Sequence, residues 1–283
     1  MRSYNTVMPE LPEVETVVRD LRPLIVGRTI AAIRTGSKKL RKPWSKDWEA
    51  ELIGSTVAAI RRRGKWILVD LDTGSILLVH LGMTGQFTAG PAGLPHHDHL
   101  HFAFEFSDEQ ELRYRDVRRF GSVQWIASDA LVQHAFGETL GPEPVDIPAK
   151  PFENDVRSSR RNLKAILLDQ SILAGVGNIY ADESLFRSRL HPQTLGCDLT
   201  RAKCAALRLA VEAVIAQAIQ YRGSTIRDYI GGSGLRGGYQ DEFKVYGRTG
   251  EPCAACGTAI EMIRVAGRSS HFCPKCQKKD PRR

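Results

Sequence analysis

The chain has 283 residues, enough for two domains with separate cores, and its hydrophobic content of 42% is ordinary for a globular protein. No apolar run approaches the roughly 20 residues of a membrane-spanning helix, and residues 1–7 lack the hydrophobic stretch of a signal peptide. Lysine and arginine exceed aspartate and glutamate by eight (40 − 32), which is compatible with a nucleic-acid partner without requiring one. The six cysteines lack the spread of a secreted disulfide scaffold, which favours the reducing cytosol.

The first distinctive segment is Met-Pro-Glu-Leu-Pro-Glu-Val-Glu at residues 8–15. In a chain that begins at Pro9, the ring nitrogen is a free secondary amine, a nucleophile that titrates near neutrality. Glu10 beside it supplies a carboxyl group for proton transfer. If residues 1–7 are retained, the same nitrogen is a tertiary amide without a nucleophilic lone pair. We therefore expect translation to begin at Met8 and Met8 to be removed, which makes residues 1–8 an extension outside the mature chain.

The N-terminal half is predicted to be one helix followed by many short strands. Val14, Val17, Val18 and Leu21 share one helical face after Pro12, which suits a first helical turn. In residues 100–106 the large apolar residues alternate strictly, as in a half-buried strand. Further strands are predicted at 29–33, 56–61, 66–71, 75–81, 111–115 and 122–126. This pattern indicates a β-sandwich or flattened barrel, which we assign to a domain at residues 9–138.

The C-terminal half changes to a helical period after a proline-rich segment. Residues 140–151 contain four prolines and almost no periodicity, which indicates an interdomain linker, placed at 139–154. Helices are predicted at 161–169, 179–188 and 200–221, the first two on either side of a glycine-rich turn at 174–177. They define a helical domain at 155–244. Residues 231–238 are too rich in glycine to hold one conformation unaided.

Four of the cysteines form two Cys-x2-Cys pairs near the C-terminus, at Cys253, Cys256, Cys273 and Cys276. Four thiolates close a tetrahedral zinc site with no open position, so we predict one structural Zn²⁺ in a ribbon at 245–283. Residues 260–265 and 270–272 are predicted to form its hairpin. Arginines in or beside this hairpin make contact with nucleic acid plausible, but ribbons that bind proteins have the same pattern. Cys197 and Cys204 are interpreted as packing residues.

The ordered motifs together resemble the bacterial formamidopyrimidine-DNA glycosylase family, base-excision enzymes that remove oxidised purines and nick the abasic strand. The motifs are MPELPEVET from residue 8, RRGKW at 62–66, HLGMTG at 80–85, RRFG at 118–121, GVGNIY at 175–180 and the four-cysteine finger. The resemblance implies an α+β multidomain fold. Its parts are an N-terminal catalytic β-sandwich with flanking helices, a helical domain with a helix–two-turn–helix element, and a zinc finger. It also implies damaged double-stranded DNA as the partner of a monomer.

The resemblance assigns the chemistry to four residues. Pro9 would attack the sugar C1′ atom and form a Schiff base, and Glu10 would protonate the sugar ring oxygen. Lys65 would contact phosphate and assist proton transfer, although taken alone it would be an ordinary surface lysine. Arg268 would bind the phosphates that flank the lesion and assist the second elimination.

An enzyme that extrudes a base must fill the gap that the base leaves. The resemblance assigns this task to Met83, Arg118 and Phe120: a flexible wedge, a guanidinium for the orphaned base and a stacking ring. Met83 alone would more often fill a core. Its place between two glycines after a strand favours exposure.

Phosphate contacts are implied for residues on other elements. Asn178, beside backbone N–H groups at a helix start, would bind a phosphate, although an asparagine here is also a common N-cap. One of Arg160 and Arg161 would add a second phosphate contact. His97 matches a DNA contact of the family.

Three other functions remain open from the sequence. An endonuclease VIII-like enzyme for oxidised pyrimidines shares the scaffold, but that branch typically has glycine where Leu11 stands. A non-catalytic DNA-binding protein fits if residues 1–7 are retained. A zinc-ribbon module that binds proteins explains only residues 253–276.

Overall fold

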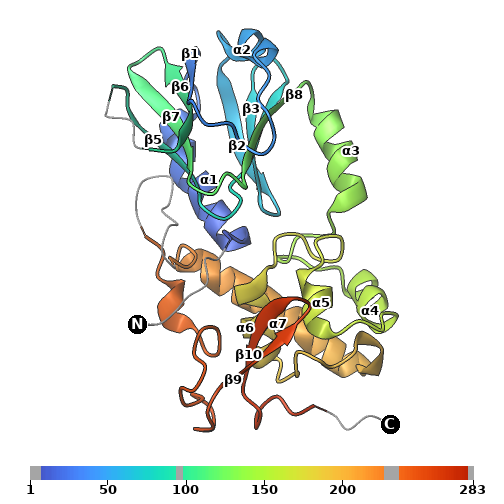
Figure 1. Cartoon of the computed structure of the whole chain (residues 1–283). Coiled ribbons are helices and arrows are strands. Elements are labelled where there is room, and N and C mark those ends of the chain that lie inside the picture. Colours follow the sequence, from blue (N-terminus) through green and yellow to red (C-terminus); the bar gives the residue numbers. More distant parts are fainter. Residues whose placement is uncertain (1–7, 94–97, 226–235, 280–283) are drawn as a thin grey trace. The chain divides into compact units, whose positions relative to one another are not determined.

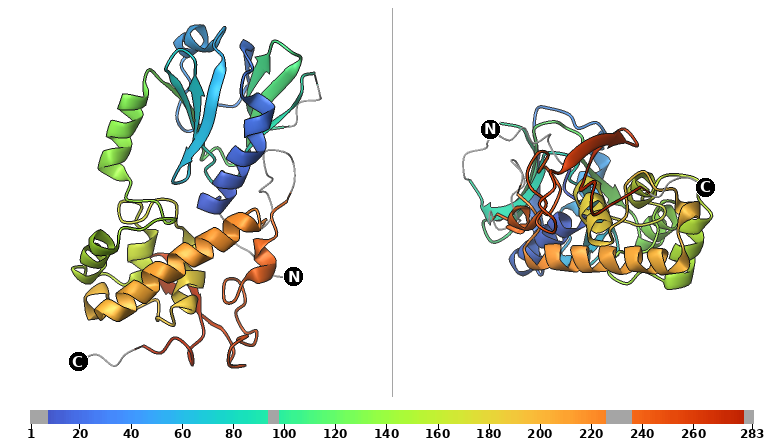
Figure 2. Two further views of the ribbon diagram at one scale, coloured as in Figure 1. Left: turned by 180° about the vertical axis from the view of Figure 1, so that it is seen from behind. Right: turned by 90° about the horizontal axis from the view of Figure 1, so that it is seen from below.

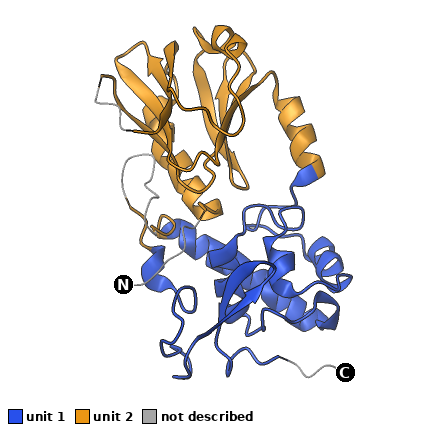
Figure 3. Ribbon diagram, viewed as in Figure 1, with its two compact units in different colours: residues 1–5, 139–220, 239–283 blue, residues 6–138, 221–238 orange. Residues whose placement is uncertain are grey.

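The computed structural model describes residues 8–93, 98–225 and 236–279 (Figure 1). The chain forms two compact units, coloured separately in Figure 3. One contains Thr6–Glu138 and Tyr221–Gly238, and the other contains Thr139–Gln220 and Tyr239–Arg283. The sequence placed residues 221–238 in the helical domain. In the structure the backbone N–H of Ser224 donates to the Glu13 carboxylate at 2.7 Å, which ties this segment to the sheet-containing unit.

Helix α1 (Leu11–Ile25) opens the sheet-containing unit, as the apolar spacing predicted. Pro12 lies in its first turn, where a missing N–H costs nothing. The Glu10 N–H donates to the Glu13 carboxylate at 2.9 Å, half of a capping box that fixes the helix start. The face with Val14, Val17 and Leu21 is fully buried.

Two antiparallel four-stranded sheets follow α1. One has the order β1-β6-β7-β5, with bounds β1 (Ile30–Thr35), β6 (Leu100–Phe106), β7 (Gln110–Asp116) and β5 (Gly85–Pro91). The other has the order β2-β3-β4-β8, with bounds β2 (Val57–Arg63), β3 (Trp66–Leu71), β4 (Ile76–His80) and β8 (Ser122–Ile126). The predicted β-sandwich is therefore confirmed, with strand ends shifted by at most a few residues.

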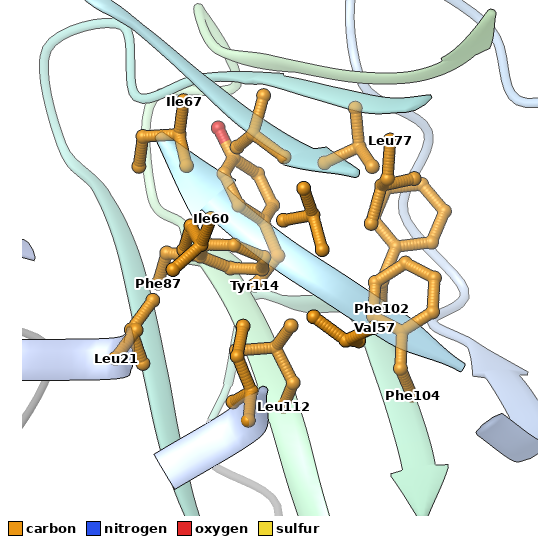
Figure 4. Close-up of a cluster of buried hydrophobic side chains, with 14 of the residues drawn as sticks. Leu21, Val57, Ile60, Ile67, Leu77, Phe87, Phe102, Phe104, Leu112 and Tyr114 are labelled. Atoms are coloured by element: carbon orange, nitrogen blue, oxygen red, sulfur yellow. The ribbon is translucent and has the colours of Figure 1, made fainter. Parts of the chain in front are cut away.

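The inner faces of both sheets and α1 enclose one hydrophobic core (Figure 4). Ile60 and Leu77 enter it from one sheet, and Phe104 and Tyr114 from the other. Leu21 of α1 closes the end of the cluster. Each fully buried side chain of this size contributes about 1.5–3 kcal/mol of transfer free energy. Burial of these side chains therefore stabilises the packing of the two sheets on each other and on α1.

The sequence missed three elements of this unit. Helix α2 (Asp47–Leu52) is only six residues long, too short for a periodic pattern. Helix α3 (Asp129–Thr139) buries only Val132 and Phe136. Strand β5 has two glycines and a proline, residues typical of turns, yet it pairs along β7, with Phe87 opposite Tyr114.

The second unit is helical, with α4 (Ala149–Arg157), α5 (Leu163–Leu168), α6 (Asn178–Arg187) and α7 (Arg201–Gln220). Helix α7, orange in Figure 2, packs against α4 and α6. The three predicted helices are confirmed, but α4 begins inside the predicted linker, because Pro148 and Pro151 occupy its N-cap and first turn. Across the described residues, no helix combines the length and apolarity that a membrane span requires.

The same unit carries the predicted hairpin, β9 (Glu261–Val265) paired with β10 (Arg268–Phe272). The buried side chain of Gln277 anchors this ribbon. Its Oε1 accepts from the Cys273 N–H at 2.9 Å, and its Nε2 donates to the Leu190 carbonyl at 2.8 Å. The ribbon is thus joined to the loop that follows α6.

Candidate functional site

Pro9 and Glu10 immediately precede α1, and both are buried. Glu10 is the N-cap residue of this helix, so its backbone is held by the capping box with Glu13. The structure therefore puts the two residues predicted for catalysis on one rigid helix start.

Glu13 has a larger role than the sequence indicated. The residue is only 2% exposed, so it is more than a charge in the first turn of the helix. Besides the Glu10 N–H, it accepts from the Ser224 N–H at 2.7 Å and from the Ser224 hydroxyl at 3.0 Å. The capping-box spacing signalled the first contact. Nothing in the sequence signalled the second, because its partners are 211 positions apart.

Lys65 lies in the turn between β2 and β3 and is half-buried. Its neighbour Arg62 donates to Glu15 of α1 at 2.9 Å and to the Gly64 carbonyl at 3.1 Å. Burial alone would raise the pKa of Glu15, but hydrogen bonds and charge from Arg62 and Arg19 leave that pKa lowered. Glu15 therefore stays ionised. Its pair with Arg62 links the β2–β3 turn, which contains Lys65, to helix α1.

Met83, Arg118 and Phe120 lie on two turns at 82–85 and 117–121, which we call the insertion turns. Phe120 is 46% exposed, and the Arg118 guanidinium carbon lies 5.0 Å from the centre of its ring. Met83 lies in a turn after β4, as predicted, but it is half-buried where the sequence favoured exposure. An exposed ring with a cation beside it can stack on and hydrogen-bond to a nucleobase.

Asn178 is the first residue of α6 in the helical unit. The N-cap is Gly177, so the interpretation of Asn178 as the capping residue was wrong. Its Nδ2 donates instead to the Ser269 hydroxyl of β10 at 3.2 Å. The Gln170 side chain holds the preceding turn, because it accepts from the Gly175 N–H at 2.9 Å. These two contacts fix the turn and the start of α6, the kind of helix N-terminus that can bind an anion.

The arginines predicted to bind phosphate differ in their surroundings. Arg161 donates to Asp169 at 2.7 Å, whereas Arg160 is exposed and has no partner within the described residues. Arg268 is exposed at the first position of β10. His97 lies outside the described residues.

The four ribbon cysteines converge as the sequence predicted. Their sulfur atoms all lie within 4.8 Å of one another, with 4.0 Å between Cys253 and Cys276 and 3.4 Å between Cys256 and Cys273. Four Zn–S bonds of about 2.3 Å in a tetrahedron separate the sulfurs by about 3.8 Å. The cluster therefore fits one Zn²⁺ with no vacant position, which is a structural and not a catalytic site.

A buried network beneath Asn178 was missed. The Lys164 ammonium, 0% exposed, donates to Asp182 at 2.5 Å and to the Asn178 carbonyl at 2.9 Å. Asp182 also accepts from the backbone N–H of His271 in β10 at 2.9 Å. An isolated lysine in an apolar stretch gives no sign of such a network, because its partners come from other elements.

Each unit thus gathers part of the predicted set. The sheet-containing unit carries Pro9, Glu10, Lys65, Met83, Arg118 and Phe120. The helical unit carries Arg160, Arg161, Asn178, Arg268 and the four cysteines. The first part thus holds the residues predicted as nucleophile, acid and partners of an unpaired base, and the second holds those predicted to bind phosphate.

Comparisons with known proteins agree with this division. Three family models match in order: the formamidopyrimidine-DNA glycosylase N-terminal domain at 8–123, its H2TH domain at 140–229, and the zinc finger found in FPG and IleRS at 250–279. Formamidopyrimidine-DNA glycosylase of Geobacillus kaustophilus is 43% identical over 96% of this chain and all of its own. That of Streptococcus pneumoniae serotype 4 is 40% identical with the same coverage.

Solved structures give the same result. A mutant Lactococcus lactis FPG in complex with a Fapy-dG-containing DNA has a TM-score of 0.90 and 37% identity, covering 96% of this chain and all of that one. Lactococcus lactis Fpg in complex with an abasic-site DNA has a TM-score of 0.89 and 37% identity, covering 95% of this chain and all of that one.

Proposed function

The chain belongs to the formamidopyrimidine-DNA glycosylase family, and we propose that it excises oxidised purines from damaged duplex DNA and cleaves the abasic strand. The likeness over nearly the whole chain to proteins solved with Fapy-dG and abasic-site DNA carries this proposal. We assign the chemistry and the contacts with the unpaired base to the sheet-containing unit, and the binding of phosphates chiefly to the helical unit with its zinc ribbon. We also propose that it acts on DNA in the reducing cytoplasm, the compartment that its cysteine usage favours.

Pro9 is the proposed nucleophile, in a chain whose first residue it is. Its deprotonated nitrogen donates a lone pair to the sugar C1′, and the bond from C1′ to the base breaks. The base leaves with the electron pair of the broken bond and takes a proton, while the Pro9 nitrogen gives up its N–H proton. The sugar ring then opens between C1′ and its oxygen, which leaves an iminium on Pro9. Because a secondary amine gives a permanently cationic iminium, it draws electrons from the C2′–H bond. Loss of that proton expels the 3′ phosphate, and a second elimination expels the 5′ phosphate.

Glu10 is the proposed proton donor to the sugar ring oxygen. It follows Pro9 directly, and the capping box with Glu13 fixes its backbone. General acid catalysis requires this kind of fixed placement next to the reacting bond. Lys65 is proposed to bind a phosphate of the damaged strand from the turn that Arg62 ties to α1.

The proposed DNA contacts divide between an unpaired base and the backbone. Met83, Arg118 and Phe120 fill the space that the extruded nucleotide leaves. Asn178 and Arg268 bind phosphates, and of the two neighbouring arginines we assign Arg160, since Arg161 is already paired with Asp169. The assignment of His97 to the same surface rests on the motif alone.

The zinc ion supplies no chemistry to the reaction. Cys253, Cys256, Cys273 and Cys276 would hold it, and a bound ion with four thiolates keeps the ribbon folded. What the chain gains is a fixed position for Arg268 at the start of β10.

Borohydride trapping tests the proposal. A chain that begins at Pro9 should form a covalent adduct with an 8-oxoguanine duplex, because borohydride reduces the iminium. A chain that retains residues 1–8 should form none, and Glu10→Gln in the shorter chain should trap more slowly. Equal trapping by both chains would show that Pro9 is not the nucleophile. A preference for oxidised-pyrimidine duplexes would favour the endonuclease VIII-like alternative, which Leu11 argues against.

A further inference from the structure

We propose that Asp116 and Thr84 are positioning residues that lock the two insertion turns into one arrangement. The inference rests on the proposed function, in which Met83, Arg118 and Phe120 enter the duplex. Neither Asp116, 0% exposed, nor Thr84, 5% exposed, reaches the surface, so both act through the residues that they hold.

The Asp116 carboxylate lies at the end of β7 and binds both turns at once. Its Oδ1 accepts from the Thr84 hydroxyl at 2.6 Å, on the turn that carries Met83. Its Oδ2 accepts from the Gly121 N–H at 2.8 Å, at the end of the turn that carries Arg118. A buried carboxylate is tolerated only when hydrogen bonds replace its water, and here these bonds come from the insertion turns.

The Thr84 hydroxyl completes the link because it both donates and accepts. While it donates to Asp116, it accepts from the Arg118 N–H at 2.9 Å. The same N–H lies 3.2 Å from Asp116 Oδ1. Only a hydroxyl can fill both roles at this position, so serine should replace Thr84 and valine should not.

The backbones of the two turns also touch directly. Gly82 has φ +61°, and a Cβ built on it would lie 2.4 Å from the Gly121 nitrogen. A Cβ on Gly121 would lie 1.8 Å from the Tyr114 hydroxyl, which donates to the His80 carbonyl at 3.0 Å. The turns therefore have no room to slide past each other.

This lock explains how exposed side chains can enter a base stack efficiently. A partly exposed wedge and a 46% exposed ring lose freedom when they insert. If the backbone beneath them is already fixed, that loss is confined to the side chains. Loosening the turns should therefore slow reactions that need a gap filled and spare those that do not.

The test compares Thr84→Val with Thr84→Ser in the chain that begins at Pro9. Thr84→Val should slow single-turnover excision of 8-oxoguanine from duplex about tenfold, the effect of a barrier raised by one or two lost hydrogen bonds. Cleavage of a preformed abasic site in single-stranded DNA, which leaves no orphaned base, should change less than about twofold. Thr84→Ser should stay close to wild type in both assays.

Amide hydrogen exchange separates failure of the lock from failure of the proposed function. Without DNA, Thr84→Val should speed exchange at Arg118 and Thr84→Ser should not. Unchanged exchange, equal slowing of both reactions, or a serine variant as slow as the valine variant would overturn the lock. If the wild-type chain cleaves no abasic DNA, the proposed function fails, and the exchange rates alone decide on the lock.

Discussion

Two regions of the molecule hold exposed loops around a buried centre: the zinc ribbon and the insertion turns. In the ribbon, four sulfur atoms within 4.8 Å of one another surround the place of a cation. In the insertion turns, two N–H groups and a hydroxyl surround the Asp116 carboxylate. The ribbon needs a metal ion that binds from solution, whereas the insertion turns are held by a carboxylate of the chain itself, at the end of β7. The ribbon should therefore depend on metal and the turns on the sandwich.

Removal of zinc should have the largest effect, and it should change the ribbon but not the insertion turns. Cys273→Ser, or a strong chelator, should unfold residues 250–279, because a ribbon of this size cannot fold without its metal. Affinity for damaged duplex should fall about 100-fold, since the phosphate contacts of this region are lost with it. Melting of the sheet-containing unit should not change.

Cys197→Ser is the matched control for this experiment, because Cys197 lies outside the cluster and is exposed. The interpretation of Cys197 as a packing residue was therefore wrong, whereas Cys204 is buried. The Cys197→Ser variant should keep both the metal content and the DNA affinity. Protected ribbon amides in the chelated protein would contradict the dependence on metal.

The two regions also differ in how far the sequence predicts them. Two Cys-x2-Cys pairs are typical of a structural zinc site, so the sequence alone identifies Cys253, Cys256, Cys273 and Cys276. The Asp116 centre is made largely by backbone N–H groups, which every residue except proline offers. No residue pattern can signal such a centre. The roles predicted for Met83, Arg118 and Phe120 rest on family resemblance alone, and nothing in the sequence signalled the contacts that hold their turns.

The fold shows the same limit. Strand β6 was predicted to the residue because its apolar side chains alternate, and that pattern is local. Strand β5 was missed because its glycines and proline are tolerated only through pairing with β7. The capping box of Glu10 and Glu13 is likewise local, but the contact of Glu13 with Ser224 is a product of tertiary structure.

Lys164→Met tests whether the buried Asp182 carboxylate stabilises the ribbon in the way that the Asp116 carboxylate holds the insertion turns. Asp182 holds the His271 N–H of β10 as well as the Lys164 ammonium. Removal of the lysine leaves a buried carboxylate without its charge partner, which should cost about 3–5 kcal/mol of unfolding free energy. Denaturant unfolding of the helical unit measures this cost.

Lys244→Met is its matched control, because the Lys244 ammonium makes a half-exposed pair with Glu242 at 3.5 Å. Pairs of that kind contribute about 0–1 kcal/mol, so the control should unfold almost as wild type does. An equal loss of unfolding free energy in the two variants would mean that the buried Asp182 network stabilises the helical unit no more than an exposed ion pair does.

Gly121→Ala tests the backbone contact between the insertion turns. A methyl group would meet the Tyr114 hydroxyl at 1.8 Å and the His80 carbonyl at 2.5 Å, so the turns must separate. Such overpacking costs about 1–3 kcal/mol, and excision from duplex should fall with it. Gly90→Ala is the control, since nothing lies within 4 Å of a Cβ there. Adding Tyr114→Phe should restore part of the loss, and a failure to do so would place the strain elsewhere.

The smallest predicted effect concerns a histidine that makes the same local bond in each unit. His80 Nδ1 accepts from the Gly82 N–H at 3.1 Å, and His191 Nδ1 accepts from the Gln193 N–H at 3.1 Å. Burial, helped by the charges of Lys65 and Lys42 and opposed by Asp116, lowers the pKa of His80 to about 4. Burial and Lys279 lower the pKa of His191. Both rings are therefore neutral in the folded chain at neutral pH.

A lowered histidine pKa makes stability depend on pH in a definite direction. The unfolded chain, with a histidine pKa near 6.5, binds the proton more tightly, so stability is complete above about pH 6.5 and declines as the pH falls towards 4. Between pH 6.5 and 5.5, His80 should remove at most about 1 kcal/mol from the sheet-containing unit. His80→Asn keeps an acceptor for Gly82 without the titration, so its melting temperature should vary less with pH, even though its contact with Trp66 is lost. A variant with an unchanged pH slope would show that protonation of His80 does not loosen the turn beneath Met83.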